Sequence, residues 1–172
     1  MDGAHLPDAW RDLYLMLGTS SAALIGLLFV ASTLHVREIV GVEMFKVRVQ
    51  NTMLVMVGTL LQATAILTPQ PLRFLGVELL ALSLWGLWFP LSLLFKASKM
   101  SAAARGGFSF YRGAFFTTGY LVGIAGAIAL VAGEQWGLYL VTASYAHSLV
   151  AGVWNAWMMM LGLGRGEEKR KR

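Results

Sequence analysis

The chain has 172 residues, of which 57% are hydrophobic and 13% are charged, and its formal net charge at pH 7 is +5. Soluble domains average about 45–50% apolar and about 25% charged residues, so the composition indicates one compact polytopic membrane domain. Without cysteine, the chain has no disulfides, thiolate metal sites or cysteine nucleophiles. The basic residues lie in loops and in the tail, beside apolar runs, which favours contacts with anionic lipid and excludes nucleic acid as a partner.

We predict an all-α integral membrane protein with five transmembrane helices that pack through glycine-rich faces. The expected helices cover about residues 13–35, 49–68, 74–95, 114–132 and 136–160, within a transmembrane domain of residues 13–161. About twenty apolar residues suffice to cross a bilayer. Residues 1–12 are expected to form an extracytoplasmic segment, and residues 162–172 a basic cytoplasmic tail.

The basic residues predict the orientation. With five helices and the N-terminus outside, twelve of the 14 basic residues fall on the cytoplasmic side, and only Arg11 and Arg73 fall outside. Positively charged loops stay in the cytoplasm, so we expect an outside N-terminus and a cytoplasmic C-terminus. The acidic start of the chain favours an uncleaved first helix over a signal peptide, which begins with a basic region.

Small residues form stripes on the first and fourth expected helices. These stripes are Gly18, Ala22 and Gly26 in the first helix, and Gly119, Gly123 and Gly126 in the fourth. Small residues let the backbones of membrane helices approach closely, so both stripes are expected to pack against other helices. The first helix, with the pattern GxSxAALxGLLFV, resembles those of small bacterial membrane proteins, and we expect the bacterial inner membrane as the location.

The turn at residues 67–72 is followed by Glu78, the only carboxylate within the long apolar runs. Gln62 and Glu78 each lie eight residues from Gln70, so in an antiparallel hairpin they sit at about the same depth and can face each other. An acid inside a membrane span indicates function, because burying its charge is costly. The functional interpretation is a protonatable or cation-attracting group beside Gln62. The structural interpretation is a carboxyl that hydrogen-bonds to Gln62 or to a serine of the first helix, or that reaches the interface.

The last expected helix carries a seam of small and polar residues, which are Ser144, His147, Ser148, Ala151, Gly152 and Asn155. On the second helix, Thr59 shares a face with Thr52 and Gln62. His147 lies about 16 Å into its helix, close to the centre of the bilayer. It is expected either to relay protons, gate a pore or bind a cofactor, or to donate a hydrogen bond to a neighbouring helix.

The sequence contains no recognisable catalytic or cofactor pattern. His35 at the cytoplasmic end and His147 at mid-membrane cannot ligate one haem within a single chain, although a haem between two subunits stays open. No lysine lies in a helix core to hold retinal, and the methionines lack the cysteine or histidine neighbours of a Cu(I) site. No Ser-His-Asp arrangement, HExxH motif or phosphate-binding glycine loop is present, so we expect no enzyme, no cofactor and no metal site.

We therefore predict a homo-oligomeric, channel-like permeation protein. Five short helices cannot enclose a sizeable cavity alone, so the route is expected between subunits. Its candidate residues are Glu78, Gln62, Thr59, Ser144, His147, Ser148 and Asn155. The alternative is an accessory or assembly subunit of a larger membrane complex, because glycine faces and polar seams serve partner helices equally well. A membrane enzyme or cofactor carrier is the third, less favoured interpretation.

Overall fold

The computed structural model describes residues 8–41, 43–99 and 110–170, and the regular structure in these ranges is helical. Its elements are α1 (Asp8–Leu34), α2 (Val36–Val40), α3 (Glu43–Leu67), α4 (Leu72–Lys99), α5 (Phe110–Ala132) and α6 (Gly137–Arg170). Five of these helices are long, whereas α2 has only 5 residues and lies between α1 and α3. The predicted all-helical class is therefore confirmed.

Four helices are long and apolar enough to cross a membrane, which supports integration into a bilayer. The stretches that meet this condition are Trp10–Leu34, Val49–Leu67, Leu72–Ser92 and Phe115–Ala132, and each overlaps a predicted span. Of the five long helices, α6 has no described stretch that is both long and apolar enough to cross a membrane. The reason is compositional, because the polar seam interrupts the apolar residues of α6.

Several helices extend past the predicted boundaries. α1 begins at Asp8, within the segment expected outside the membrane, and α3 begins at Glu43. At the other end of the chain, α6 continues to Arg170, through the segment expected as a tail. Hydropathy marks where apolar residues begin and end, whereas helical hydrogen bonding continues into polar sequence, because each N–H still reaches the carbonyl four residues earlier.

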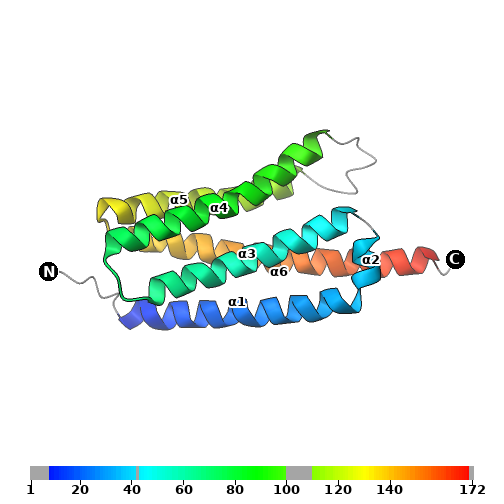
Figure 1. Ribbon diagram of the computed structural model, residues 1–172, viewed down its shortest axis with the longest axis horizontal. Helices are drawn as coiled ribbons and strands as arrows, with labels where there is room; N and C mark the ends of the chain where they lie inside the picture. Colours follow the sequence, from blue (N-terminus) through cyan, green and yellow to red (C-terminus); the bar gives the residue numbers. More distant parts are fainter. Residues whose placement is uncertain (1–7, 42, 100–109, 171–172) are drawn as a thin grey trace.

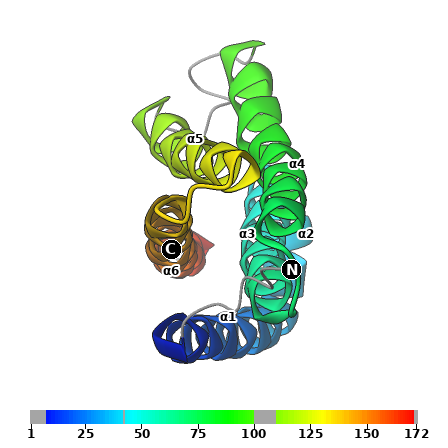
Figure 2. The same ribbon diagram turned by 90° about the vertical axis from the view of Figure 1, so that its left-hand side faces the viewer.

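The five long helices lie roughly side by side along the longest axis of the molecule, and successive ones are antiparallel (Figure 1). Viewed end-on, α1, α3, α4 and α5 form an arc, and α6 lies on its inner side (Figure 2). α6 contacts α5, α3 and α1, while α3 contacts α1, α4 and α6. These two helices therefore hold the bundle together.

Two tight turns lie at the end of the bundle where α1 begins (Figure 1). Residues 68–71 join α3 to α4 and include Pro69 and Pro71, which cannot continue a helix in the usual way. Residues 133–136 join α5 to α6, and Gly133 has a φ of 93°, a left-handed conformation that glycine adopts without strain. Gly126 precedes this turn on α5, and Gly137 follows it on α6. A Cβ atom on Gly126 would lie 2.8 Å from the carbonyl oxygen of Gly137, so the two helices meet almost backbone to backbone.

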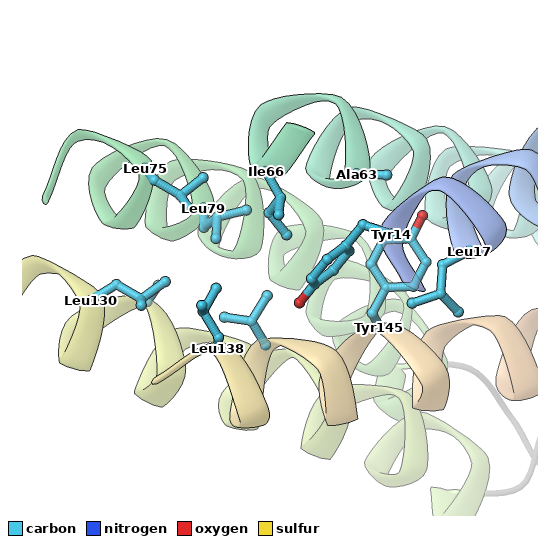
Figure 3. Close-up of a cluster of buried hydrophobic side chains, with 11 residues drawn as sticks. Tyr14, Leu17, Ala63, Ile66, Leu75, Leu79, Leu130, Leu138 and Tyr145 are labelled. Carbon is cyan, nitrogen blue, oxygen red and sulfur yellow. The ribbon is translucent and has the colours of Figure 1, made fainter. Parts of the chain in front are cut away.

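The main hydrophobic core lies near these turns, and every long helix contributes to it (Figure 3). Its most completely buried large side chains are Tyr14, Ile66, Leu79, Leu130 and Tyr145. The rings of Tyr14 and Tyr145 meet edge to face, with centroids 6.1 Å apart. A smaller cluster further along the bundle consists of Val55, Met56 and Tyr120. Between membrane helices such packing stabilises mainly through van der Waals contact.

Candidate functional site

The polar seam of α6 faces the other helices of the bundle. Ser144, Ser148, Ala151 and Gly152 are buried, and His147 and Asn155 are half-buried. The outward side of the same stretch is apolar and consists of Val150, Val153 and Trp154, which are all exposed. An unpaired polar group in hydrocarbon is costly, so the seam determines which side of α6 faces inward.

Two residues of the seam bind the backbone of α5. Ser144 Oγ donates to the carbonyl oxygen of Gly119 over 2.8 Å, and His147 Nε2 lies 2.8 Å from the carbonyl oxygen of Phe115. A carbonyl oxygen only accepts, so Nε2 carries the hydrogen of this bond. The imidazole also packs against the Phe115 ring, with centroids 4.2 Å apart. In the neutral ring, Nδ1 then keeps its lone pair.

A closed group of hydroxyls joins α1 to α3. Ser21 Oγ lies 2.8 Å from the carbonyl oxygen of Met56 and 2.7 Å from Thr59 Oγ1. Thr59 Oγ1 in turn lies 2.7 Å from the same carbonyl. One hydroxyl donates to the carbonyl and the other donates to its neighbour, so both are satisfied in the buried interface. Thr59, a predicted site residue, therefore acts together with Ser21 of α1.

Further along, α6 binds α3. Asn155 Nδ2 donates to Thr52 Oγ1, which joins residues 103 positions apart in the sequence. On the same side of α6, a Cβ atom on Gly152 would overlap the end of the Met56 side chain. Asn155 and Gly152 of α6 thus meet α3 at Thr52 and Met56.

Two tyrosines complete the polar interior, and the sequence analysis did not identify them. Tyr14 Oη lies 2.6 Å from Thr142 Oγ1, whose own hydrogen is donated to the carbonyl oxygen of Leu138. Tyr14 is therefore the donor between α1 and α6. Tyr145 Oη is fully buried, and within the described ranges it has no hydrogen-bond partner. A tyrosine within an apolar helix could have indicated a polar contact in the interior, because a buried phenol hydroxyl usually has a hydrogen-bond partner.

Glu78 lies on the exposed side of α4, away from this interior. Its Oε2 accepts a hydrogen bond of 2.7 Å from Gln70 Nε2, and the same amide nitrogen donates to the carbonyl oxygen of Ala65. Gln62 is only 8% exposed and faces inward, and among the described residues its amide makes no hydrogen bond. The anticipated pairing of Gln62 with Glu78 does not form, because equal distance from a turn matches depth but not the helix face.

The predicted small-residue stripe of α5 lies along the contact with α6. Cβ atoms on Gly119, Gly123 and Gly126 would meet His147, Ser144 and the start of α6, respectively. At Gly123 the neighbouring hydroxyl of Ser144 lies 2.7 Å from the added atom. These glycines therefore let the polar seam of α6 approach the α5 backbone.

The surroundings of the small-residue stripe of α1 differ along the helix. A Cβ atom on Gly18 would lie 3.1 Å from Ala63 Cβ, so this glycine sits at the α1–α3 contact. Ala22 and Gly26 are exposed, and a Cβ atom on Gly26 would meet nothing within 4 Å. Within the described ranges, the beginning of the stripe therefore lies at a helix contact and its later part is exposed.

The interior offers hydroxyl, amide and imidazole groups, which can orient water or pass a proton. In the part of the chain that the structure describes, no three His, Cys, Asp or Glu residues lie together as metal ligands would. Compared with protein-family models, curated proteins and solved structures, the chain matches none. The arrangement of the polar groups is therefore what supports a function.

Proposed function

We propose that the protein is a channel-like permeation protein that works as a homo-oligomer. One observation carries the proposal: polar groups follow the inner side of α6 from Thr142 to Asn155. These thirteen residue steps correspond to about 20 Å along the helix, which is most of a hydrocarbon core of about 30 Å. Because these side chains face inward, we propose that the route follows the inner side of α6 in each protomer, in place of the route between subunits that the sequence predicts.

Glu78 has a separate role in this proposal. It is exposed on α4, six residues after the first residue of that helix, so it lies about 9 Å along the helix from its start. A carboxylate near the mouth of a route raises the local concentration of cations. We therefore propose cations, including protons, as the permeating species.

The proposed orientation has the N-terminus outside and the C-terminus in the cytoplasm of a bacterial inner membrane. It rests on the twelve basic residues that this arrangement collects on the cytoplasmic side. The same residues favour contact with anionic lipid headgroups at that face, because each basic residue near such a surface contributes about 1 kcal/mol.

The test is cation flux into liposomes that contain the purified protein. The variant His147→Phe keeps an aromatic ring beside Gly119 but removes the donor to Phe115. Its control is Trp154→Phe, on the exposed side of the same helix. We expect flux to fall with His147→Phe and to persist with Trp154→Phe. Equal flux in the two correctly folded variants would remove the α6 seam from the mechanism.

A second candidate function is that of an accessory subunit in a larger membrane complex. It is favoured by the outward side of α4, where Trp85 and Trp88 are 42% and 70% exposed on the helix that also carries the exposed Glu78. Partner helices bind such aromatic and polar surfaces as readily as lipid does. The native mass after gentle extraction separates the two functions. A multiple of 18.8 kDa from one chain type supports the homo-oligomer, and stoichiometric foreign chains support the subunit.

A further inference from the structure

The hydroxyl of Tyr145 is enclosed in the bundle with its hydrogen bonding incomplete. Tyr145 is fully buried, and among the described residues its hydroxyl is the enclosed polar group that has no hydrogen-bond partner. Tyr14 is equally buried, yet its hydroxyl donates to Thr142, as a buried phenol hydroxyl usually does to some acceptor. Protein encloses the Tyr145 oxygen, so water binds beside it only if the surrounding side chains move.

Tyr145 lies where α6 meets α1 and α3. Its ring packs edge to face on the ring of Tyr14, and it shares the main core with Leu17 of α1 and Ala63 of α3. The ring extends from α6 towards the other two helices (Figure 3). These helices are close together here, because a Cβ atom on Gly18 would lie 3.1 Å from Ala63 Cβ. Tyr145 therefore fills the interior between three helices.

An acceptor for the unpaired hydrogen lies close to Tyr145, on α3. Thr59 precedes Ala63 by four residues, so both lie on the same side of that helix. The Thr59 hydroxyl is a polar neighbour of the Tyr145 hydroxyl, but the two do not meet the geometry of a hydrogen bond. A small shift of α6 against α3 is therefore what separates the two groups from pairing.

The hydrogens of the neighbouring hydroxyls leave room for this bond. Ser21 and Thr59 contact each other and the carbonyl oxygen of Met56, so one hydroxyl donates to the carbonyl and the other donates to its neighbour. In either case Thr59 Oγ1 keeps at least one lone pair. A bond from Tyr145 to Thr59 therefore gives all three hydroxyls an acceptor, and the contacts of Ser21 and Met56 stay intact.

We propose that Tyr145 is a switch residue between two arrangements of α6. In the described arrangement its hydroxyl is unpaired, and in the second arrangement it donates to Thr59 Oγ1. Tyr145 lies between Thr142 and Asn155, which mark the ends of the proposed route. Where this inference rests on the proposed function, Tyr145 is the gate, and the described arrangement is the closed state. The switch itself depends only on the hydroxyls of α3 and α6.

Thermal unfolding of the full-length protein in detergent tests the described arrangement. Tyr145→Phe removes an unpaired buried hydroxyl and no hydrogen bond, so we expect the melting temperature to rise by about 2–4 °C. The matched control is Tyr14→Phe, which removes the donor to Thr142 and is expected to lower the melting temperature. A fall in both variants would mean that the Tyr145 hydroxyl already has a partner, which overturns the proposal.

NMR of the protein with ¹³C at Cζ of its tyrosines tests the second arrangement, because the Cζ chemical shift depends on the hydrogen bonding of the hydroxyl. The Tyr145 signal is the one that disappears in Tyr145→Phe. We expect it to show exchange between two states, as two signals or as relaxation dispersion, and Thr59→Val to remove this exchange. The control Thr64→Val, whose exposed hydroxyl donates to its own helix at Leu60, should retain it. No exchange in the unmodified protein, or exchange that persists in Thr59→Val, would overturn the switch.

Cation flux into liposomes separates the switch from the permeation function. If Tyr145 is the gate, Tyr145→Phe holds the closed state, and flux falls although the protein becomes more stable. Unchanged flux in this variant would reject the role as a gate. Exchange at Tyr145 in an unmodified protein that carries no cations would reject the permeation function and leave the switch in place.

Discussion

The imidazole ring of His147 lies against Gly119, in the place where a side chain on that residue would be. The same ring donates from Nε2 to the carbonyl oxygen of Phe115, one turn earlier on α5. The hydrogen bond holds the two helices together, and the missing side chain lets them approach. Gly119 therefore contributes, with Gly123 and Gly126, to the short distance between α5 and α6.

We expect Gly119→Ala to destabilise the protein, because the added Cβ atom would overlap His147 Cδ2. Overpacking of this kind typically costs about 1–3 kcal/mol. Thermal unfolding in detergent measures the effect. The matched control is Gly26→Ala, where the added atom meets nothing within 4 Å. A loss of equal size at both positions would show that the α5–α6 contact is not the cause.

We expect Ser21→Ala to lower the free energy of unfolding by about 1 kcal/mol. The substitution removes the hydrogen bonds that the Ser21 hydroxyl makes with the Met56 carbonyl and with Thr59 in a buried interface. The adjacent Ser20→Ala is the control, since that exposed hydroxyl donates only to Met16 of its own helix. Chemical or thermal unfolding compares the two variants. If Ser20→Ala lowered the free energy of unfolding more than Ser21→Ala, the α1–α3 interface would differ from the one described here.

The bond between Asn155 and Thr52 predicts energetic coupling between α6 and α3. Asn155→Leu and Thr52→Val are expected to be non-additive, with a coupling of about 0.6 kcal/mol, the mean found for polar contacts between membrane helices. A double-mutant cycle on unfolding free energies measures this term. Strict additivity would mean that the two side chains do not interact in the membrane.

The orientation can be read from single cysteines, because the natural chain has none. Glu134 lies exposed in the α5–α6 turn, and Lys46 lies exposed near the start of α3. With the N-terminus outside, an impermeant thiol reagent applied to whole cells should label Glu134→Cys but not Lys46→Cys. Both should react once the membrane is opened. The reverse labelling pattern would invert the proposed topology.

The positions of the helices follow well from the sequence. The polar seam of α6 is expected from the sequence along a route between subunits, whereas the structure places it inside the bundle. Long apolar runs locate the spans, because the bilayer requires about twenty apolar residues from each. On α6 the polar seam from Ser144 to Asn155 identifies the inner side, since α6 otherwise shows only apolar residues to its surroundings there. In a membrane, polarity is thus the more informative signal for the face of a helix.

Where both sides of a helix are apolar, the sequence does not say which side meets protein. Gly18, Ala22 and Gly26 form one stripe, yet among the described residues Gly18 lies against Ala63 of α3, whereas Ala22 is exposed and a Cβ atom on Gly26 would meet nothing within 4 Å. Glu78 and Gln62 match in depth, yet one faces outward and the other inward. These differences depend on the rotation of whole helices, which packing partners far apart in the sequence determine.

The short turn at Gly133 has a consequence for how the chain enters the bilayer. α6 is the long helix whose described sequence is least suited to partition into lipid alone, because its hydroxyl, amide and imidazole groups need α5 and α3 as partners. A connection of four residues, 133–136, leaves α6 little freedom to separate from α5. Insertion of α6 is therefore expected to proceed as a hairpin, with the glycine face of α5 shielding its polar side from lipid during biosynthesis.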